Sequence, residues 1–233
     1  MNIALFGYGK MGRMLEKLGL ERGHTIVAKI DVNTTKIDYS TIDVAIDFST
    51  PDAAFENIVE CFKNGVPVIS GTTGWLSKFD EAVSICNQYE GAFIYASNFS
   101  LGVNIFFELN AQLAKMIANL EQYQVHLEEI HHTQKLDAPS GTAITLAEGI
   151  IENSVYSAWK LNQSGANEIP IISKRIGDVP GTHTIQYQST VDSLTIEHKA
   201  DNREGFALGA LIAAEWIHRK TGVYTMKDVL NLK

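Results

Sequence analysis

Residues 2–12 of the chain are NIALFGYGKMG, and the class of fold follows from this segment. An apolar run suited to a buried strand leads directly into three glycines with the spacing GxGxxG, and apolar residues at helical spacing follow. In such a strand–turn–helix unit, Gly7 permits the tight turn, Gly9 lets the backbone approach a pyrophosphate, and Gly12 lets the helix pack closely on the strand. The amides and the dipole of the helix N-terminus would hold the anion. The segment therefore predicts a dinucleotide-binding turn, and a tight βα turn without a ligand is the alternative.

The sequence up to about residue 98 continues this pattern. Short apolar runs, which predict buried strands, alternate with segments that have apolar residues at helical spacing. The predicted strands are residues 2–6, 25–31, 44–48, 67–70 and 93–96, and the predicted helices are residues 11–22, 52–64 and 76–89. Strict alternation of strand and helix is typical of parallel βαβ units covered by helices on both faces. We therefore expect an α/β domain with a Rossmann-type doubly wound parallel sheet.

Asp31 stands at the end of the second predicted strand, nineteen positions after Gly12. A carboxylate in that place accepts hydrogen bonds from the ribose of a dinucleotide. It also repels a 2′-phosphate, which favours NADH, whereas Lys29 and Lys36 lie near enough in the sequence to offset that repulsion. The sequence therefore predicts NADH, NADPH or both as the cofactor, and the alternative is that Asp31 only caps a turn.

Two further loops, Gly71–Thr73 and Ala96–Phe99, follow predicted strands. In a doubly wound sheet, the loops at the carboxyl ends of the strands face the ligand crevice. Small residues there would let the backbone approach a nicotinamide ribose, although the first loop is an equally good structural turn. The predicted cofactor-binding residues are Gly7, Tyr8, Gly9, Lys10, Met11, Gly12, Asp31, Gly71, Thr72, Thr73, Ala96, Ser97, Asn98 and Phe99.

The pattern changes after residue 98, where helices become fewer and strands cluster. The later predicted helices are residues 101–120, 140–151, 204–219 and 226–230, and the later predicted strands are residues 123–131, 169–176, 184–190 and 193–200. Strands clustered in this way suggest an open mixed or antiparallel sheet, so we expect a smaller α+β domain. We place a dinucleotide-binding domain at residues 1–98, with residues 204–233 packed back on it, and a second domain at residues 99–203.

The segment HHTQKLDAPSGTA, residues 131–143, concentrates titratable side chains between a predicted strand and a predicted helix. Ser140, which follows a proline, suits the N-cap of that helix. The amides of Gly141 and Thr142 would then lie at a helix N-terminus, where anions bind. A carboxylate docked there beside Lys135 and two histidines indicates an anionic substrate that undergoes proton transfer. Because neighbouring residues of a strand point to opposite faces, the strand must end or bend there if both histidines are to act.

The longer segment EEIHHTQKLDAPSGTA, residues 128–143, resembles the hallmark of the dihydrodipicolinate reductase family. Further segments resemble that family in the same order along nearly the whole chain, namely DFSTP (47–51), GTTG (71–74), SNFSLGVN (97–104) and RIGDVPGTH (175–183). The resemblance implies hydride transfer from NADH or NADPH to 4-hydroxy-tetrahydrodipicolinate, which yields tetrahydrodipicolinate with loss of water in lysine and diaminopimelate biosynthesis. It also implies a homotetramer in which the second domain holds the substrate and the subunit contacts.

The same resemblance implies roles for individual residues. His131 matches the catalytic histidine of the family, and Lys135 matches its general acid. The substrate-contacting positions are matched by His132, Ser140, Gly141 and Thr142. The glycine loop is one residue shorter than the common family pattern and resembles a short-loop subgroup, which leaves the choice between NADH and NADPH open.

The residues also suit this chemistry on their own terms. Hydride addition to one carbon of a conjugated imine makes the neighbouring carbon nucleophilic, and the ammonium of Lys135 can protonate it from hydrogen-bond distance. His131 could orient that lysine or stabilise developing charge, and His132 and the helix amides could give charge-assisted hydrogen bonds to the substrate carboxylates. The cofactor performs the reduction, and the protein supplies placement and electrostatics. Placement across two domains implies closure to exclude water, with hinges near residues 98 and 204.

The composition argues against several other classes. The formal net charge of −8 argues against a general nucleic-acid surface. No segment has the roughly 20 uninterrupted apolar residues of a membrane span, and no basic leader is visible, so we expect a cytoplasmic protein without a membrane partner. Cys61 and Cys86 lack CxxC spacing and are expected to be buried thiols in a reducing compartment.

Several residues allow a second interpretation. Glu128 and Glu129 stand beside the paired histidines, but no third metal ligand follows at a suitable spacing, so we expect no metal site. Arg203 could reach a substrate carboxylate or cap the following helix region, and Asp178 is expected to be a turn residue. The histidines expected to be structural or at the surface are His183, His198 and His218.

Two other functions share parts of the pattern. A redox-sensing protein that binds NADH without turnover would be expected to lack the Lys135 loop. An amino-acid dehydrogenase acting on aspartate or homoserine has a similar two-domain build, but it would not be expected to carry the whole run HHTQKLDAPSGT.

Overall fold

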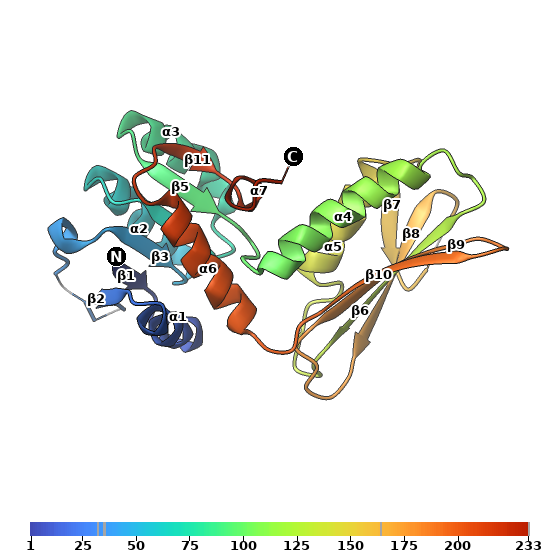
Figure 1. Cartoon of the computed structure of the whole chain (residues 1–233), viewed down its shortest axis with the longest axis horizontal. Helices are drawn as coiled ribbons and strands as arrows, with labels where there is room; N and C mark the ends of the chain where they lie inside the picture. The colour runs from blue at the N-terminus through green and yellow to red at the C-terminus, as the bar shows by residue number, and fades with distance from the viewer. Residues whose placement is uncertain (32, 35, 164, 233) are drawn as a thin grey trace. The chain divides into compact units, whose positions relative to one another are not determined.

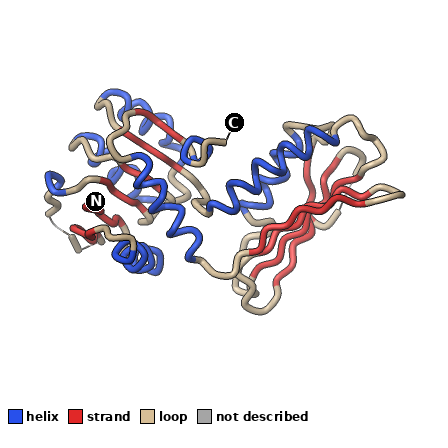
Figure 2. Tube along the Cα trace, viewed as in Figure 1, coloured by secondary structure: helices blue, strands red, loops and turns tan. Residues whose placement is uncertain are grey.

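The protein forms two compact units in a computed structural model that describes residues 1–31, 33–34, 36–163 and 165–232. Unit 1 comprises Met1–Leu101 and Glu204–Lys233, and unit 2 comprises Gly102–Arg203. Each unit holds one β-sheet with its own helices, as Figure 1 shows by element and Figure 2 by type of secondary structure. The chain therefore leaves unit 1 once and returns to it at Glu204.

Unit 1 is built on a six-stranded sheet in which the neighbouring strands are parallel. In spatial order its strands are β11 (Gly222–Tyr224), β5 (Ala92–Tyr95), β4 (Val68–Ser70), β3 (Val44–Asp47), β1 (Asn2–Phe6) and β2 (Thr25–Ile30). The chain passes from β1 outward to β2 and resumes with β3 on the other side of β1, so the direction of winding reverses there. In sheets of this kind, ligands bind outside the carboxyl ends of the strands at that point. The predicted Rossmann-type doubly wound sheet is thus confirmed.

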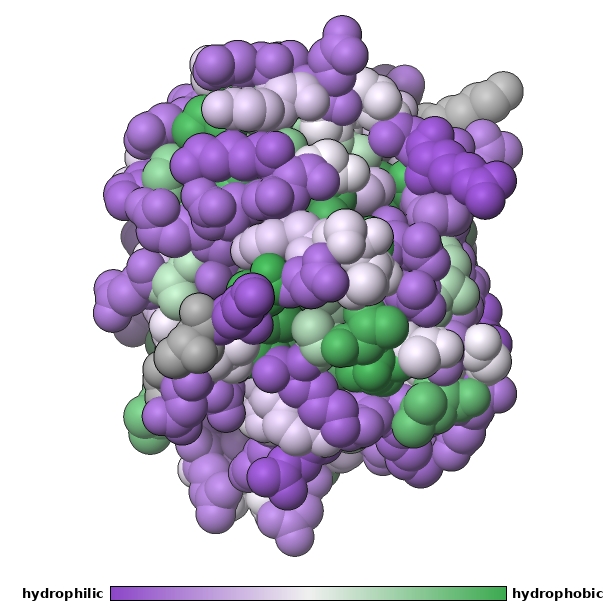
Figure 3. Space-filling model, turned by 90° about the vertical axis from the view of Figure 1, so that its left-hand side faces the viewer, coloured by the Kyte–Doolittle hydropathy of each residue, from purple (hydrophilic) through white to green (hydrophobic). Residues whose placement is uncertain are grey.

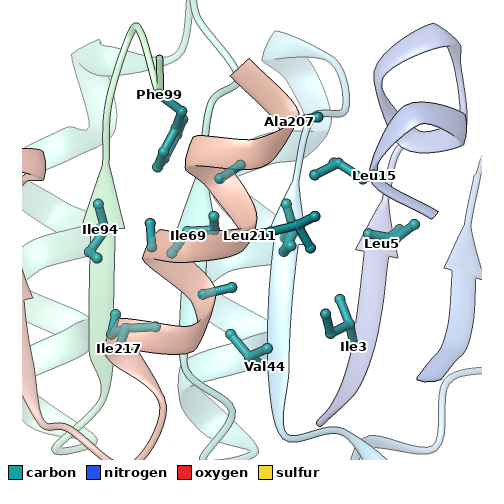
Figure 4. Close-up of a cluster of buried hydrophobic side chains, with 14 of the residues drawn as sticks. Ile3, Leu5, Leu15, Val44, Ile69, Ile94, Phe99, Ala207, Leu211 and Ile217 are labelled. Atoms are coloured by element: carbon teal, nitrogen blue, oxygen red, sulfur yellow. The ribbon is translucent and has the colours of Figure 1, made fainter. Parts of the chain in front are cut away.

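Helices cover both faces of the sheet in unit 1. They are α1 (Lys10–Glu21) and α6 (Glu204–Ile217) on one face, and α2 (Pro51–Lys63) and α3 (Phe79–Gln88) on the other. Alternate residues of β1 enter opposite cores, since Ile3 and Leu5 pack with α6 whereas Ala4 and Phe6 pack with α2. Figure 4 shows the first of these cores, with Leu211 of α6 among the strand side chains. Burial on both faces explains why the four inner strands, β1, β3, β4 and β5, are apolar at nearly every position.

Unit 2 is built on a five-stranded mixed sheet. In spatial order its strands are β10 (Ser193–Lys199), β9 (Thr182–Gln188), β6 (Gln124–His131), β8 (Glu168–Arg175) and β7 (Ala158–Leu161). Strand β9 runs antiparallel to β10 and β6, whereas β6, β8 and β7 run parallel. The helices α4 (Leu101–Ile117) and α5 (Gly141–Ile151) share a hydrophobic core with one face of this sheet. The predicted α+β domain with a mixed sheet is confirmed.

The structure departs from the predicted elements in a few places. Residues 76–89, expected to form one helix, form the 3-10 turn η2 (Leu76–Lys78) followed by α3, because the backbone of Lys78 (φ −106°, ψ 11°) leaves helical geometry. The sequence pattern predicts neither β7 nor β11, which are both short edge strands without a buried residue. The remaining short elements are η1 (Tyr39–Thr41) and α7 (Met226–Val229).

Within the described ranges, no helix is both long and apolar enough to cross a lipid bilayer. On the face drawn in Figure 3, hydrophilic residues cover most of the surface and hydrophobic residues gather in small groups. Small apolar groups of this kind are ordinary on a folded protein surface.

Candidate active site

The glycine turn after β1 lies where the winding of the sheet reverses. Gly7 has φ +89°, and a Cβ there would lie 2.1 Å from the carbonyl oxygen of Phe48, which directly follows β3. A Cβ at Gly12 would lie 2.4 Å from the carbonyl oxygen of Gly7. At Gly9, by contrast, a Cβ would meet none of the described residues within 4 Å. Gly7 and Gly12 therefore permit close packing, and Gly9 leaves an open side from which a phosphate could approach.

The first turn of α1 is suited to an anion. Gly9 is its N-cap, and among the described residues no side chain caps the helix by a hydrogen bond. The first helical residues, KMGR, include no carboxylate that would compete for the amides. Backbone amides that no side chain caps, beside a glycine with space around its Cα, can donate hydrogen bonds to the pyrophosphate of a dinucleotide.

Tyr8 and Lys29 form a cluster with Glu16 beside the glycine turn. The hydroxyl of Tyr8 donates to Glu16 Oε2, and Nζ of Lys29 lies 2.5 Å from Glu16 Oε1 and 4.9 Å from the centroid of the Tyr8 ring. Hydrogen bonds from Lys29 and then Tyr8 lower the pKa of the Glu16 carboxyl. Because Glu16 offsets the charge of Lys29, this lysine adds little to the attraction of a 2′-phosphate.

Asp31 is exposed directly after β2 and caps its own turn. Its Oδ1 accepts a hydrogen bond from the amide of Asn33 (2.9 Å), and its amide donates to Thr34 Oγ1 (3.0 Å). Asp31 therefore does cap a turn, whereas its predicted contact with a ribose stays a prediction. The cap is compatible with the ribose interpretation, because it uses one oxygen of the carboxylate.

Asp47, the last residue of β3, is a buried carboxylate that the sequence analysis does not single out. Its side chain is 0% exposed and accepts hydrogen bonds from Ser49 Oγ (2.6 Å), Ser70 Oγ (2.7 Å) and Thr72 Oγ1 (2.7 Å). Thr72 Oγ1 also accepts from the amide of Ser49 (2.9 Å), so the turns after β3 and β4 are tied together. The side chain of Thr72 therefore points into the protein. A cofactor could contact this residue only through its backbone. In the sequence, the signal for this buried carboxylate is the group of hydroxyl residues in DFSTP and GTTG, because these two segments follow neighbouring strands and can supply hydrogen-bond donors to it.

The turn Ala96–Phe99 after β5 is partly core. Phe99 is 1% exposed, and its ring lies in edge contact with the ring of Phe48 at a centroid distance of 5.9 Å. A Cβ at Gly209 of α6 would lie 1.8 Å from the carbonyl oxygen of Phe99, so α6 contacts this turn directly. Figure 4 shows Phe99 beside α6 at the edge of the core. The Phe99 ring supports the turn, and only its backbone is available to a ligand.

The other predicted cofactor residues surround these turns. A Cβ at Gly71 would lie 2.2 Å from the Phe48 ring, so this position requires glycine. The amide of Ala96 donates to the carbonyl of Ser70 (3.2 Å), and Asn98 Oδ1 accepts from the amide of Ser100 (2.9 Å). Met11 packs against the core that contains α6. The exposed members of the predicted cofactor set are Gly9, Lys10, Asp31, Thr73 and Ser97.

In unit 2, β6 ends at His131, and this separates the two adjacent histidines. His131 is buried, and its Nδ1 lies 2.8 Å from Oε2 of Glu129. His132 is half-buried, and its Nε2 lies 3.2 Å from an Nη atom of Arg203. The strand ends where the sequence analysis requires it to end, and each histidine has its own surroundings.

Lys135 is held by Asp137 in the loop that follows. Its Nζ donates to both carboxylate oxygens of Asp137 at 2.8 Å. Burial raises the pKa of the Asp137 carboxyl, but the hydrogen bonds and charge of Lys135 outweigh it, and the pKa is lowered overall. The ammonium therefore has a fixed anionic partner two residues away, which the sequence analysis leaves without a role.

Glu129 is the second fully buried carboxylate among the described residues, with 0% exposure. Its Oε1 accepts hydrogen bonds from the amide of Ser140 (3.1 Å) and from Arg175 (3.0 Å), and its Oε2 faces His131. Burial raises the pKa of the Glu129 carboxyl, but hydrogen bonds from His131, Ser140 and Arg175 hold it well below its ordinary value. An ionised carboxylate thus joins β6, β8 and the start of α5.

His183 on β9 completes this buried cluster. Its Nε2 lies 3.1 Å from Ser140 Oγ and 3.9 Å from Glu129 Oε2. Burial, followed by the charge of His131, lowers the pKa of His183 to about 3, so its ring stays neutral. One potential ligand atom from each of Glu129, His131 and His183 lies within 4.8 Å of the others. Spacing along the chain gives no sign of this third candidate ligand, because His183 comes from another strand.

Ser140, Gly141 and Thr142 differ in their accessibility at the start of α5. Ser140 is the N-cap, as predicted, because its buried hydroxyl accepts from the amide of Ala143 (3.2 Å). Gly141 is exposed, and a Cβ there would meet none of the described residues within 4 Å. Thr142 is half-buried. The open side of this helix terminus therefore lies at Gly141, whereas the Ser140 side chain is used inside the protein.

A cavity of about 230 Å³ lies beside His132 in unit 2. Its lining residues are His132, Gln134, Asp178, Pro180, Asn202 and Arg203. Arg203 gives it a cationic side, and Asp178, expected to be a turn residue, takes part in the lining. The cavity is large enough for part of a small anionic ring.

These features define a class of protein, the two-domain NAD(P)H-dependent oxidoreductases. Unit 1 supplies the glycine turn, and unit 2 supplies His131 and Lys135 at the end of β6 and in the loop after it, with a small cavity that His132 and Arg203 help to line. Residues 1–99 match the family described as dihydrodipicolinate reductase, N-terminus, and residues 102–230 match dihydrodipicolinate reductase, C-terminus. The chain belongs to the dihydrodipicolinate reductase family.

Individual relatives agree with this membership. A 4-hydroxy-tetrahydrodipicolinate reductase from Christiangramia forsetii is 57% identical over 234 residues, which cover 99% of this chain and 98% of that protein. One from Archaeoglobus fulgidus is 34% identical and covers 99% of this chain and 100% of its own. A dipicolinate-bound dihydrodipicolinate reductase from Paenisporosarcina sp. TG-14 shares the fold, with a TM-score of 0.78 at 23% identity, covering 100% of this chain and 99% of that one. The family resemblance seen in the sequence is confirmed.

Proposed function

We propose that this chain reduces 4-hydroxy-tetrahydrodipicolinate to tetrahydrodipicolinate with NADH or NADPH, as a step of lysine and diaminopimelate biosynthesis. The observation that carries the proposal is the loop between β6 and α5, where an ammonium, two histidines and a helix N-terminus occur within residues 131–142. Full-length relatives named as this reductase support it.

In this proposal, Lys135 is the general acid. A bound NADH or NADPH would supply a hydride to the conjugated imine that forms when the substrate loses its 4-hydroxyl group as water. Lys135 then gives a proton to the neighbouring carbon, and Asp137 keeps the ammonium oriented through two hydrogen bonds of 2.8 Å. His131 stabilises charge on the substrate from the buried end of the loop, where Glu129 holds its Nδ1.

The two substrate carboxylates are bound by two groups of donors. We assign one carboxylate to His132 and Arg203, which line the same cavity with 3.2 Å between their nitrogen atoms. We assign the other to the backbone of Gly141 and Thr142 at the N-terminus of α5. The side chain of Ser140 points into the protein and caps the helix, so in this proposal Ser140 stabilises the N-terminus of α5 and does not contact the substrate.

The cofactor is bound by unit 1 at the glycine turn and the turns after β2, β4 and β5. The open side of Gly9 and the first amides of α1 take the pyrophosphate, and Asp31 takes the adenosine ribose. Because Lys29 is paired with Glu16, the charge of Asp31 dominates nearby, and we expect NADH to bind at least as tightly as NADPH.

Assembly as a homotetramer and a cytoplasmic location belong to the same proposal. Ile105, Leu109 and Met116 of α4 are exposed, and their spacing places them along one face of the helix. A second copy of the chain would cover such a face. Light scattering should then report about four times the chain mass of 25.7 kDa.

A coupled assay tests the activity. Purified protein is mixed with the preceding synthase, pyruvate and aspartate semialdehyde, and the nicotinamide absorbance is followed with NADH and, separately, with NADPH. Oxidation that depends on the synthase supports the proposal. No oxidation of either cofactor contradicts it, and turnover of aspartate or homoserine instead would point to the amino-acid dehydrogenases.

A further inference from the structure

The buried face of β6 changes from apolar to charged along its length. Residues 125, 127, 129 and 131 share this face and are Val, Leu, Glu and His. Val125 and Leu127 belong to the hydrophobic core of unit 2, whereas Glu129 continues their row with a carboxylate that is 0% exposed. An ionised group in such a place is costly unless partners surround it. Its partners therefore indicate what it does.

The two oxygens of Glu129 have different partners. Oε1 accepts from the amide of Ser140 (3.1 Å) and from Arg175 (3.0 Å), and both donors are permanent, since neither group loses its proton near neutral pH. Oε2 faces titratable groups instead, with Nδ1 of His131 at 2.8 Å and Nε2 of His183 at 3.9 Å. The same carboxylate thus anchors the start of α5 and contacts the ring of His131.

Arg175 extends this anchor to the loop of Lys135. Its Nε donates to the carbonyl of Lys135 (3.3 Å), and its other end donates to the carbonyl of Asp137 and to Glu129. The backbone on both sides of the Lys135–Asp137 ion pair is therefore tied to the buried carboxylate. Displacing Glu129 would release the loop and the histidine together.

We infer that Glu129 is the positioning residue of this site: its Oε2, 2.8 Å from Nδ1 of His131, orients that ring and, whenever the ring carries a single proton, keeps that proton on Nδ1, so that Nε2 is the atom presented to the substrate; through Arg175, Glu129 also holds the Lys135 loop. The inference rests on the proposed function for its catalytic consequence. Nε2 of His131 is directed toward Gly181, where an added Cβ would lie 3.1 Å away. The hydrogen bond made by one imidazole nitrogen determines whether the other nitrogen carries a proton. Glu129 can therefore influence the reaction without contacting the substrate.

A Glu129→Gln variant gives a directional test. The new amide has one oxygen and one NH2 group, and the fixed donors of Ser140 and Arg175 require the oxygen on their side. The NH2 group then faces His131 Nδ1, and the ring must move its proton to Nε2 to accept a hydrogen bond. We expect the tautomer of His131, measured by nitrogen NMR on histidine-labelled protein, to change from Nδ1–H in the wild type to Nε2–H in the variant.

The kinetic readout separates positioning from folding. Loss of a group that orients a catalytic side chain costs about 10- to 100-fold in activity. We expect kcat of E129Q to fall by that factor, while the Kd for NADH, which unit 1 binds, stays at the wild-type value. Glu128→Gln is the matched control, because Glu128 is the preceding strand residue, points to the other face and pairs with Lys174 at 2.5 Å. It should change neither the tautomer nor kcat.

The outcomes distinguish this inference from its competitors. If the wild type is inactive in the coupled assay, the proposed function fails, whereas the tautomer of His131 still tests Glu129. The inference is overturned if wild-type His131 carries its proton on Nε2, or if E129Q keeps both the wild-type tautomer and kcat. It is also overturned if the wild type binds one equivalent of Zn²⁺ that His183→Gln abolishes and that activity requires, because Glu129, His131 and His183 would then form a metal site.

Discussion

Replacing Gly209 by alanine tests how closely α6 approaches the turn after β5. An added Cβ would lie 1.8 Å from the carbonyl oxygen of Phe99 and 2.8 Å from its carbonyl carbon. Side-chain carbons essentially never come closer than 3.0 Å, so the helix or the turn must move by about 1.2 Å. The obstacle is backbone, so we place the cost at the upper end of the range for overpacked cores, about 3 kcal/mol. Alanine recovers up to about 1 kcal/mol of helix preference, which leaves a net destabilisation of about 2 kcal/mol.

Gly205→Ala on the same helix is the matched control. Its nearest atom would be Ser100 Oγ at 3.7 Å, an ordinary contact, so this variant should be stabilised by about 0.4–1 kcal/mol. The midpoints of urea unfolding measure both changes. Because Phe99 ends the proposed cofactor turn, NADH should also bind more weakly to G209A, as measured by nicotinamide fluorescence. If G209A is as stable as the wild type and binds NADH equally well, the close approach of α6 does not exist.

Three further predictions concern the polar groups of the two units. Lys135→Met should lower kcat by at least about 100-fold with an unchanged Kd for NADH, and an equal loss of both would show that the lysine is structural. Asp47→Asn should destabilise unit 1 by about 2–4 kcal/mol in urea unfolding, because an NH2 group replaces an oxygen that accepts hydrogen bonds from two hydroxyls; a loss below about 1 kcal/mol would contradict this account. Because the pKa of His183 is lowered from 6.5 to about 3 in the folded protein, its contribution to stability is complete above about pH 6.5 and decreases as the pH falls toward 3. The slope reaches about 1.4 kcal/mol per pH unit, and His183→Gln should flatten the pH dependence of unfolding in this window.

The fold of unit 1 could be predicted because its signals are local. Strands buried on both faces are continuous apolar runs, and the glycine turn marks both the end of β1 and the start of α1. The elements that the pattern misses lie at sheet edges. Strand β7 has no buried residue, and β11 has only 3 residues, so neither needs an apolar run to form.

The candidate site was predicted in its loops but not in its buried supports. Lys135 and His131 stand out because polar residues cluster with a proline and a helix cap. Asp47 and Glu129 do not, because a single carboxylate in a strand also fits a solvent-facing position, and only pairing across strands shows that it is enclosed. His183 is opposite Glu129 in the register of β9, 54 residues along the chain, and spacing in the sequence gives no sign of it. The burial of Phe99 likewise depends on α6, whose residues come more than 100 positions later.

Unit 1 is assembled from two stretches of chain that unit 2 separates in the sequence, and this has a consequence during translation. Until the ribosome has made α6 and β11, α1 is the one described helix that covers the face of the sheet on which α6 packs, and the edge at β5 is unpaired, so Ile3, Leu5 and Val44 are only partly shielded from water. A truncated product that stops before Glu204 therefore has an incomplete hydrophobic core, and the apolar side chains that it exposes are recognised by chaperones and proteases.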